Sequence, residues 1–254
     1  ASTFNRGIPY IQIPTSLVSQ VDSSIGGKTA IDVPYGKNLI GTFYQPKMVI
    51  IDPLVLKTLP EKEYFSGMAE VIKHAIIRDK ELFNYLNQEK KAIINRDLDV
   101  LEKIIEINCN IKRQIVEEDE KESNLRKILN YGHTIGHAVE KIMDYQLLHG
   151  ECVAMGMAVE AEISSRMGYL NSNEVKEIEE LIKTFNLPIT IPKGIAEITI
   201  YQTTLLDKKS IKNEPHYSLP KKLGEMVSLQ NSYGITVERS TVIETIRTNQ
   251  LKQS

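Results

Sequence analysis

The sequence LNYGHTIGHAVE at Leu129–Glu140 and the sequence LLHGECVAMGM at Leu147–Met157 place three histidines within seventeen residues. The whole chain contains five histidines, so most of them gather in this one region. Apolar residues at helical spacing surround them, which predicts that the imidazoles are held on packed helices. Imidazole is the commonest neutral metal ligand and also transfers protons near neutral pH. The pattern therefore favours metal-assisted chemistry.

The bulk composition is typical of a soluble globular protein with one large domain or two smaller ones. The 254 residues are 41% hydrophobic and 25% charged. A net charge of -2 argues against a nucleic-acid-binding protein, whose surface is basic. Two cysteines cannot build a disulfide framework, and every apolar run is shorter than the ~20 residues of a membrane span. We expect a cytoplasmic protein with no signal peptide, no nucleic-acid partner and no membrane partner.

Two short apolar runs near the start, Tyr10–Pro14 and Lys47–Asp52, predict buried strands of a parallel sheet. Two such strands are marginal unless they have neighbours in the same sheet. Only nine residues precede Tyr10. We therefore expect residues 1–53 to be the C-terminal part of an α/β domain, whose remaining strands are absent or are supplied by another chain.

Residues 54–254 carry apolar residues at three- and four-residue spacings, which predicts a mainly α-helical domain. The boundary between the two domains is expected near residues 52–58. A hairpin is predicted where Lys221-Lys222-Leu223-Gly224 separates two short apolar runs. The predicted helices span residues 61–80, 97–118, 125–141, 151–167, 173–185 and 241–248.

His133 and His137 are four residues apart and would share one face of a helix, a geometry that can hold a metal ion. Gly132 and Gly136 bracket His133, so we expect little side-chain bulk to obstruct access to its imidazole. The alternative is that a histidine of this group caps a helix or is a satisfied core residue.

Glu70 is a candidate carboxylate ligand in the helical sequence SGMAEVIKHAI at Ser66–Ile76. An acid and a base, here Glu70 and Lys73, are costly to bury on an apolar helix unless they are paired or metal-bound. The alternative is a solvated polar stripe on this helix. Spacing alone selects His133 with His137, and the pattern leaves open which two histidines would join Glu70.

The segment at Gln20–Gly41 contains a glycine turn followed by lysine, as phosphate-binding loops do. A Walker-type loop needs glycine where this chain has Asp22, so that match fails. The Gly26-Gly27 turn is still suited to close approach of a ligand, and the alternative is an ordinary turn with solvated lysines. The candidate donors to an anionic substrate with phosphate or carboxylate groups are Lys28, Lys37, Asn38, Arg6, Lys112, Arg126, Lys208 and Lys209.

The chain resembles the 3-dehydroquinate synthase family in long segments that follow the family's order. These are Ile13–Ile31, Gly36–Asp52, Gly67–Asp79, Leu129–Glu140 and Leu147–Glu151. The resemblance covers nearly the whole chain and implies a dehydroquinate synthase-like fold. Residues 1–53 would be the C-terminal part of an NAD-binding domain that lacks its N-terminal part, and residues 54–254 would bind metal and substrate.

The activity implied by the resemblance is the second step of the shikimate pathway. A lyase of this family converts 3-deoxy-D-arabino-heptulosonate 7-phosphate into 3-dehydroquinate and phosphate. Bound NAD removes a hydride from C5 and later returns it, and phosphate elimination, ring opening and intramolecular aldol closure complete the reaction.

The resemblance also assigns roles to individual residues. Zinc, with cobalt as an alternative, is placed on Glu70, His133 and His149, which replaces the pair selected by spacing. Arg6 resembles the arginine that reaches the partner subunit's phosphate site, which implies a homodimer. The implied catalytic residues are His137, Lys73, Asn130 and Arg126. The implied substrate-binding residues are Arg6, Asp22, Lys28, Asn38, Lys112, Glu122 and Lys209. The implied NAD-binding residues are Thr15, Ser16, Asp22, Lys28, Lys37, Val55, Leu56, Lys57 and Thr58.

Three alternatives remain at this point. Another sugar-phosphate cyclase, such as a 2-deoxy-scyllo-inosose synthase, would use the same zinc and NAD, but its substrate lacks the carboxylate that Arg126 suits. A polyol dehydrogenase of the same superfamily would release NADH. Because the N-terminal part of the NAD domain is absent, this chain is also open to interpretation as an inactive fragment that only dimerises or binds metal.

Overall fold

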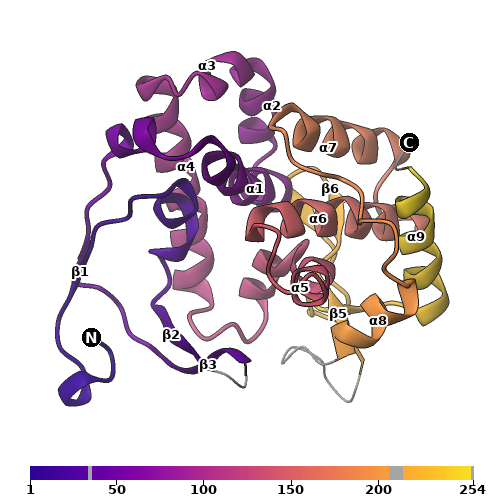
Figure 1. The fold of residues 1–254 in the computed structure, drawn as a ribbon, viewed down its shortest axis with the longest axis horizontal. Helices are drawn as coiled ribbons and strands as arrows, with labels where there is room; N and C mark the ends of the chain where they lie inside the picture. The colour runs from indigo at the N-terminus through magenta and orange to yellow at the C-terminus, as the bar shows by residue number, and fades with distance from the viewer. Residues whose placement is uncertain (34–35, 206–213, 253–254) are drawn as a thin grey trace.

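A computed structural model of the protein describes residues 1–33, 36–205 and 214–252. Strands and short helical turns occupy the N-terminal segment, and longer helices packed around a central α1 follow it (Figure 1). This order confirms the predicted α/β segment followed by a mainly helical body. The N-terminal elements are η1 (Phe4–Arg6), β1 (Ile11–Gln12), η2 (Ser19–Ser23), β2 (Lys28–Val33), β3 (Gly36–Phe43), β4 (Met48–Val49) and η3 (Pro53–Thr58).

Strands β1 and β4 form the parallel pair that the two apolar runs predicted, with Ile11 opposite Met48. Both strands are shorter than predicted, and the prediction that they are buried is wrong, because Ile11 is 56% exposed and Met48 55% exposed. The buried side chain of Gln20 joins their carboxyl ends, because its Nε2 donates to the carbonyl oxygens of Pro14 at 3.3 Å and Asp52 at 2.9 Å. Asp52 then caps η3 by accepting a 2.9 Å hydrogen bond from the backbone nitrogen of Leu54, so η3 begins where the domain boundary was predicted.

An antiparallel hairpin of β2 and β3 lies between these strands in the sequence, and the sequence analysis did not predict it. Two glycines in the left-handed region, Gly26 at φ +101° and Gly27 at φ +63°, lead the chain into β2. The segment interpreted as an anion-binding turn is thus a turn followed by a hairpin. Lys28 begins its first strand and Asn38 lies in its second strand.

The helical body is built around α1, whose residues from Tyr64 to Ile77 are all buried. A helix buried on all sides must be apolar almost throughout, so its few polar side chains need partners within the protein. The helices are α1 (Glu61–Arg78), α2 (Lys80–Gln88), α3 (Lys90–Ile94), α4 (Leu98–Glu118), η4 (Leu125–Asn130), α5 (His133–Ile142), α6 (His149–Arg166), α7 (Ser172–Thr184), α8 (Glu197–Leu205) and α9 (Arg239–Leu251).

The single helix predicted over residues 125–141 is wrong, because the chain breaks between η4 and α5. Gly132 adopts the left-handed conformation at φ +78°, and α5 begins at His133. A side chain is strained at such a φ, so glycine allows the turn there. A helix extending from residue 61 to 80 is also not observed, since Asp79 ends α1 and caps α2 through a 2.9 Å hydrogen bond from the backbone nitrogen of Leu82.

The glycines beside His133 serve the packing of α5 against α6, a role that the sequence analysis did not predict. A Cβ atom on Gly136 would lie 2.8 Å from the carbonyl oxygen of Cys152. A Cβ atom on Gly156 would lie 1.9 Å from the carbonyl oxygen of Gly132. The backbones of α5 and α6 therefore touch, which only residues without side chains permit.

The C-terminal segment returns to pack on α6. The predicted hairpin is confirmed as β6 (Pro220–Lys222) and β7 (Glu225–Met226), with Pro220 opposite Met226. A second pair of strands, β5 (His216–Tyr217) and β8 (Ile235–Thr236), and helix α8 were not predicted. None of the helices in the described part of the chain combines the length and apolarity that crossing a membrane requires.

Candidate functional site

A cavity of about 950 Å³ lies between the β2–β3 hairpin, the C-terminal end of α4 and the N-terminal ends of α5 and α6. Its wall includes residues from segments that are far apart in the sequence. Eight residues that the resemblance implicated meet here: Asp22, Lys28, Asn38, Lys112, Glu122, Arg126, His137 and His149. The structure thus assembles most of the predicted substrate site in one place.

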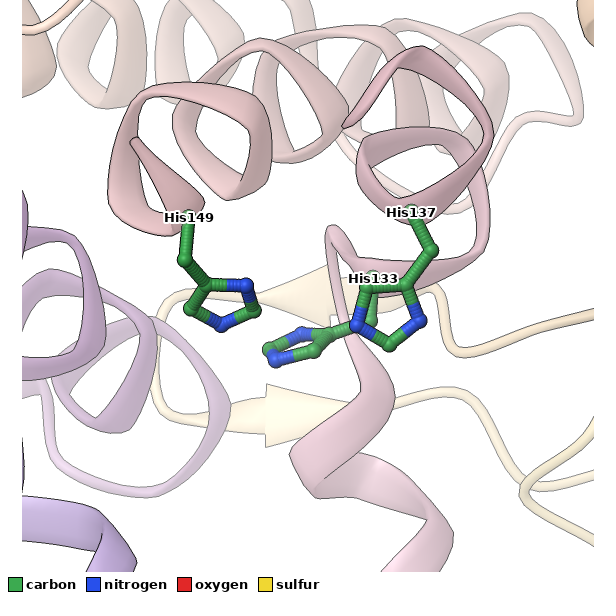
Figure 2. A group of neighbouring side chains, drawn as sticks. All are labelled: His133, His137 and His149. Atoms are coloured by element: carbon green, nitrogen blue, oxygen red, sulfur yellow. The ribbon is translucent and has the colours of Figure 1, made fainter. Parts of the chain in front are cut away.

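Three histidine side chains converge at this cavity (Figure 2). His133 is the first residue of α5, His137 lies one turn later, and His149 is the first residue of α6. The ring centroids are 5.1 Å apart for His133 and His137, 5.3 Å for His133 and His149, and 5.8 Å for His137 and His149. One nitrogen from each ring lies within 4.8 Å of the other two, which is close enough for a shared metal ion.

Glu70 brings a carboxylate from α1 to two of these rings. Its Oε1 lies 3.4 Å from Nε2 of His133 and 3.4 Å from Nε2 of His149. Both Glu70 oxygens are buried and accept no hydrogen bond of normal geometry from the described residues. Ligands about 2.1 Å from a zinc ion at tetrahedral angles lie about 3.4 Å from one another. The two separations from Glu70 match this spacing, so the Glu70 carboxylate and the two imidazoles could share one metal ion.

The orientation of His133 suits a metal ligand. Its Nδ1 lies 3.1 Å from the carbonyl oxygen of Tyr131, so Nδ1 carries the proton and Nε2 keeps its lone pair toward Glu70. Burial and the neighbouring Lys73 ammonium lower the pKa of His133 to about 3, which keeps the ring neutral. A neutral imidazole is the form that binds a metal ion.

The charges around Glu70 are balanced within the protein. Burial opposes its charge, but the neighbouring Lys73 ammonium holds the pKa of the Glu70 carboxyl well below its usual range. Lys73 is itself buried beside Glu70, which raises the pKa of Lys73 against the effect of burial. His149 differs from His133, because Glu140 and Glu70 outweigh burial and raise its pKa to about 9. A metal ion would therefore displace a proton from His149 on binding.

A second polar group lies beneath Asp22, and sequence reasoning missed two of its members, His74 and Asn108. The Asp22 carboxylate lies 2.7 Å from Nζ of Lys112 and 3.4 Å from Nε2 of His74. Nδ1 of His74 lies 2.9 Å from Oδ1 of Asn108, whose amide nitrogen donates to the carbonyl oxygen of Ile104 at 2.7 Å. The position of His74 on the same apolar helix as Glu70, one turn later, was the available signal.

One wall of the cavity is a loop whose backbone is held by the side chain of Asp119. Sequence reasoning also missed this residue. Its carboxylate accepts hydrogen bonds from the backbone nitrogens of Ser123 (2.8 Å), Asn124 (2.7 Å) and Arg126 (3.0 Å), and from the Ser123 hydroxyl (2.8 Å). These bonds outweigh burial and lower the pKa of Asp119 to about 2. The loop presents Glu122, which pairs with Lys28 and accepts a 2.8 Å hydrogen bond from Asn130.

Arg126 is buried and lines the cavity, but two of its donors bind the backbone. Nη1 donates to the carbonyl oxygen of Glu120 at 2.5 Å, and Nη2 donates to that of Gly26 at 3.1 Å. A Cβ atom on Gly26 would lie 2.3 Å from Nη2, so this glycine makes room for the guanidinium. The Nε atom is buried without a hydrogen-bond partner among the described residues.

The predicted NAD residues follow the two parallel strands. Thr15 and Ser16 come after β1, and Val55–Thr58 lie in η3 after β4. The carboxyl ends of neighbouring parallel strands are where nucleotides bind in open α/β sheets. The side chain of Leu56 is buried in the core, so it offers only its backbone, and its carbonyl oxygen already accepts a 2.7 Å hydrogen bond from Arg96.

Several predicted residues are not among those that line the cavity, or are not fully described. Lys73 and Asn130 do not line it, although Lys73 pairs with Glu70 and Asn130 donates to Glu122. Arg6 lies exposed in η1 and is not part of the cavity wall. Only the backbone of Lys37, in β3, is described. Lys208 and Lys209 lie outside the described residues.

Comparison with known proteins gives one consistent family. Residues 1–66 match the family model described as 3-dehydroquinate synthase N-terminal, and residues 67–210 match the model described as 3-dehydroquinate synthase C-terminal. The 3-dehydroquinate synthase of Thermodesulfovibrio yellowstonii is 48% identical over 227 residues, which are 89% of this chain and 63% of that protein. This chain thus spans less than two thirds of the relative's length.

Two solved structures are also similar along almost the whole chain. The 2-epi-5-epi-valiolone synthase of Streptomyces hygroscopicus, with NAD+ and Zn2+ bound, has a TM-score of 0.89 at 25% identity and covers 100% of this chain and 69% of its own. A 2-deoxy-scyllo-inosose synthase in complex with carbaglucose-6-phosphate, NAD+ and Co2+ has a TM-score of 0.87 at 26% identity, covering 98% and 69%. The fold is therefore that of sugar-phosphate cyclases.

Proposed function

Because the chain belongs to the 3-dehydroquinate synthase family, we propose that the protein acts as a 3-dehydroquinate synthase. The reaction would convert 3-deoxy-D-arabino-heptulosonate 7-phosphate into 3-dehydroquinate and phosphate. The observation that carries this proposal is the convergence of Glu70, His133 and His149 beside a cavity lined by Lys28, Lys112 and other polar groups. A metal site next to cationic groups suits a phosphorylated polyol with a carboxylate.

Glu70, His133 and His149 would hold zinc or cobalt, and the residues that follow β1 and β4 would hold part of NAD. When bound, NAD supplies reversible hydride transfer at C5, and the metal ion polarises the substrate hydroxyls. Lys73 keeps Glu70 ionised, because its buried ammonium lies against the carboxylate. Nδ1 of His133 stays protonated toward Tyr131, which leaves Nε2 free to coordinate.

The cavity residues would bind and orient the substrate. Lys28 and Asn38, which line the cavity, would donate to the phosphate. The family resemblance assigns the same role to Lys209. Lys28 pairs with Glu122 in this structure, so a phosphate group would compete with that carboxylate for the ammonium. Lys112 and Asp22 are a pre-formed ion pair that can hold substrate hydroxyls.

Proton transfer would fall to His137, which lies in the cavity wall next to the two histidine ligands. At this position its imidazole can move a proton as the phosphate leaves. Asn130 would assist through Glu122, a residue of the cavity wall to which its side chain donates. We further propose that the protein is cytoplasmic and homodimeric, with Arg6 reaching the phosphate site of the partner subunit.

The second candidate function is another sugar-phosphate cyclase, because both similar solved structures belong to this group. Arg126 favours the dehydroquinate reaction. Its guanidinium belongs to a residue of the cavity wall and is suited to a carboxylate, which glucose 6-phosphate lacks.

The experiment is phosphate release from 3-deoxy-D-arabino-heptulosonate 7-phosphate in the presence of zinc and NAD. The 254-residue chain is compared with a version extended at its N-terminus by the corresponding part of a relative. Turnover by the extended protein without accumulation of NADH supports the proposal. If the extended protein is inert with this substrate but active with glucose 6-phosphate, the substrate assignment is wrong. Accumulation of NADH with a simple polyol would indicate a dehydrogenase.

A further inference from the structure

We propose that Glu160, a buried residue of α6 outside the cavity wall, is a positioning residue for the metal site. It holds the peptide that orients His133, and so it sets the strength of His133 as a ligand. This inference rests on the metal site proposed above. It assigns a role to a side chain that is not among the residues lining the cavity.

The N-terminus of α5 explains why a carboxylate is needed here. The first N–H groups of a helix have no acceptor within the helix, and a Ser, Thr, Asp or Asn side chain usually supplies one. The capping position of α5 is Gly132, which has no side chain. Glu160 supplies the acceptors instead: Oε2 accepts from the backbone nitrogen of Gly132 at 2.8 Å, and Oε1 accepts from that of Ile135 at 3.3 Å.

Close helix packing lets Glu160 reach this position. The backbone of Gly156 lies against the carbonyl oxygen of Gly132, where any Cβ atom would be only 1.9 Å away. Glu160 follows one helical turn later on the same face of α6. Its side chain is fully buried, with 0% of its surface exposed, so its oxygens depend on protein donors.

The link to His133 runs through a single peptide group. The N–H of Gly132 and the carbonyl of Tyr131 belong to the same peptide bond. Its N–H donates to Glu160, and its carbonyl oxygen accepts from Nδ1 of His133 at 3.1 Å. Hydrogen bonds in series polarise one another, so the carboxylate makes that carbonyl a stronger acceptor. A stronger acceptor at Nδ1 makes Nε2 a more basic ligand, as in carboxylate–histidine–metal arrangements where the contact is direct.

The same peptide is held from its other side. The Tyr131 hydroxyl donates to the carbonyl oxygen of Met157 at 2.8 Å, and Tyr131 is fully buried. Glu160 and Met157 both belong to α6, so α6 fixes the position of the Tyr131–Gly132 peptide. The orientation of the His133 imidazole therefore depends on α6. The first residue of α6, His149, is itself a proposed ligand.

The test is a titration of the 254-residue chain with Co2+, followed by its visible absorption. All three proposed ligands lie in this chain, so the measurement does not depend on enzymatic activity. We expect about tenfold weaker Co2+ binding in Glu160→Gln and up to about hundredfold weaker binding in Glu160→Leu, the range typical of lost outer contacts to a metal ligand. Glutamine keeps the shape and one acceptor, so it tests the proposal even if the leucine variant does not fold.

Asn249→Leu is the matched control. Asn249 is a buried residue of α9 that also makes two backbone hydrogen bonds, accepting from Ile191 at 2.9 Å and donating to Ile189 at 2.8 Å. Its loss should lower the thermal unfolding temperature and leave Co2+ affinity unchanged. A loss of affinity in the Glu160 variants alone separates positioning from general destabilisation.

Two outcomes would overturn the inference in different ways. Wild-type Co2+ affinity in folded Glu160→Gln, with affinity lost in Glu70→Gln, refutes the role of Glu160 and leaves the metal site standing. Equal binding by the wild-type chain and Glu70→Gln refutes the metal site, and the inference falls with it.

Discussion

Replacement of Asp119 by alanine should destabilise the protein and distort one wall of the cavity. Asp119 is buried at the end of α4, and its two oxygens accept four hydrogen bonds between 2.7 and 3.0 Å from the loop that presents Glu122 and Arg126. Each such bond contributes about 0.5–1.5 kcal/mol, and bonds to one group are not additive. We therefore expect Asp119→Ala to lower the free energy of unfolding by about 2–4 kcal/mol at pH 7.

The pKa of Asp119 gives this prediction a pH dependence with a definite sign. The pKa is lowered in the folded protein from 3.8 to about 2, because the hydrogen bonds favour the carboxylate. A lowered folded pKa stabilises the protein above the unfolded value and loses that stabilisation as pH falls from about 4 to about 2. The shift corresponds to about 2.5 kcal/mol at most, and near the protein surface we expect about 1–2 kcal/mol.

Urea unfolding of the wild-type chain and Asp119→Asn at several pH values between 7 and 2.5 measures this effect. The difference in unfolding free energy should be largest at neutral pH and should shrink steadily below pH 4. Glu118→Gln is the matched control, since Glu118 is the exposed preceding residue, and it should change stability by less than about 0.5 kcal/mol. A difference between wild type and Asp119→Asn that stays constant with pH would refute the reasoning.

Two further substitutions test the packing and the charge balance around the metal site. Gly156→Ala should destabilise the protein by more than about 2 kcal/mol in urea unfolding, because its Cβ atom would lie 1.9 Å from a backbone carbonyl oxygen. Gly234→Ala is the control, since its Cβ atom would have no neighbour closer than 3.3 Å. Equally small losses of stability in both variants would contradict the prediction. Lys73→Met should lower the free energy of unfolding by about 3–5 kcal/mol, because Glu70 would stay buried without its ammonium partner. Lys62→Met, at the exposed N-terminal end of α1, should change it little. Added Co2+ should restore part of the stability lost in Lys73→Met, since a cation would again neutralise Glu70; no recovery would argue against Glu70 as a ligand.

The helical periodicity of the sequence predicted most of the long helices because apolar spacing records which face is buried. The helices predicted over residues 97–118, 151–167 and 173–185 correspond to α4, α6 and α7 with small shifts at their ends. The β2–β3 hairpin was missed because most of its strand residues are exposed, so no alternation of buried and exposed side chains appears in the sequence. The break before α5 was missed because Gly132 was interpreted as an opening for a ligand.

Residue types alone predicted only part of the chemistry of the site. The concentration of histidines and the isolated acid of α1 indicated a metal site, and the family resemblance supplied the combination of Glu70, His133 and His149. Spacing within one helix favoured His133 with His137, because sequence distance reports neighbours on the same helix only. His74 and Asn108 contact one another from segments that are distant in the sequence, so no local pattern marks them. Asp119 binds only the loop that directly follows it, and the sequence analysis assigned no role to that loop's backbone.

The sequence by itself determined the family, the order of the α/β and helical parts, and the residue types available for metal and anion binding. These follow from local spacing and from long matching segments, which a linear sequence contains. The tertiary structure alone decided that Glu70 of α1 meets His133 and His149, that glycines bring α5 and α6 into backbone contact, and that Glu160 holds the peptide behind His133. The physical reason is that a buried charge or helix end is stabilised by any partner that packing brings within hydrogen-bond distance. For the N-terminus of α5 that partner, Glu160, comes from another helix.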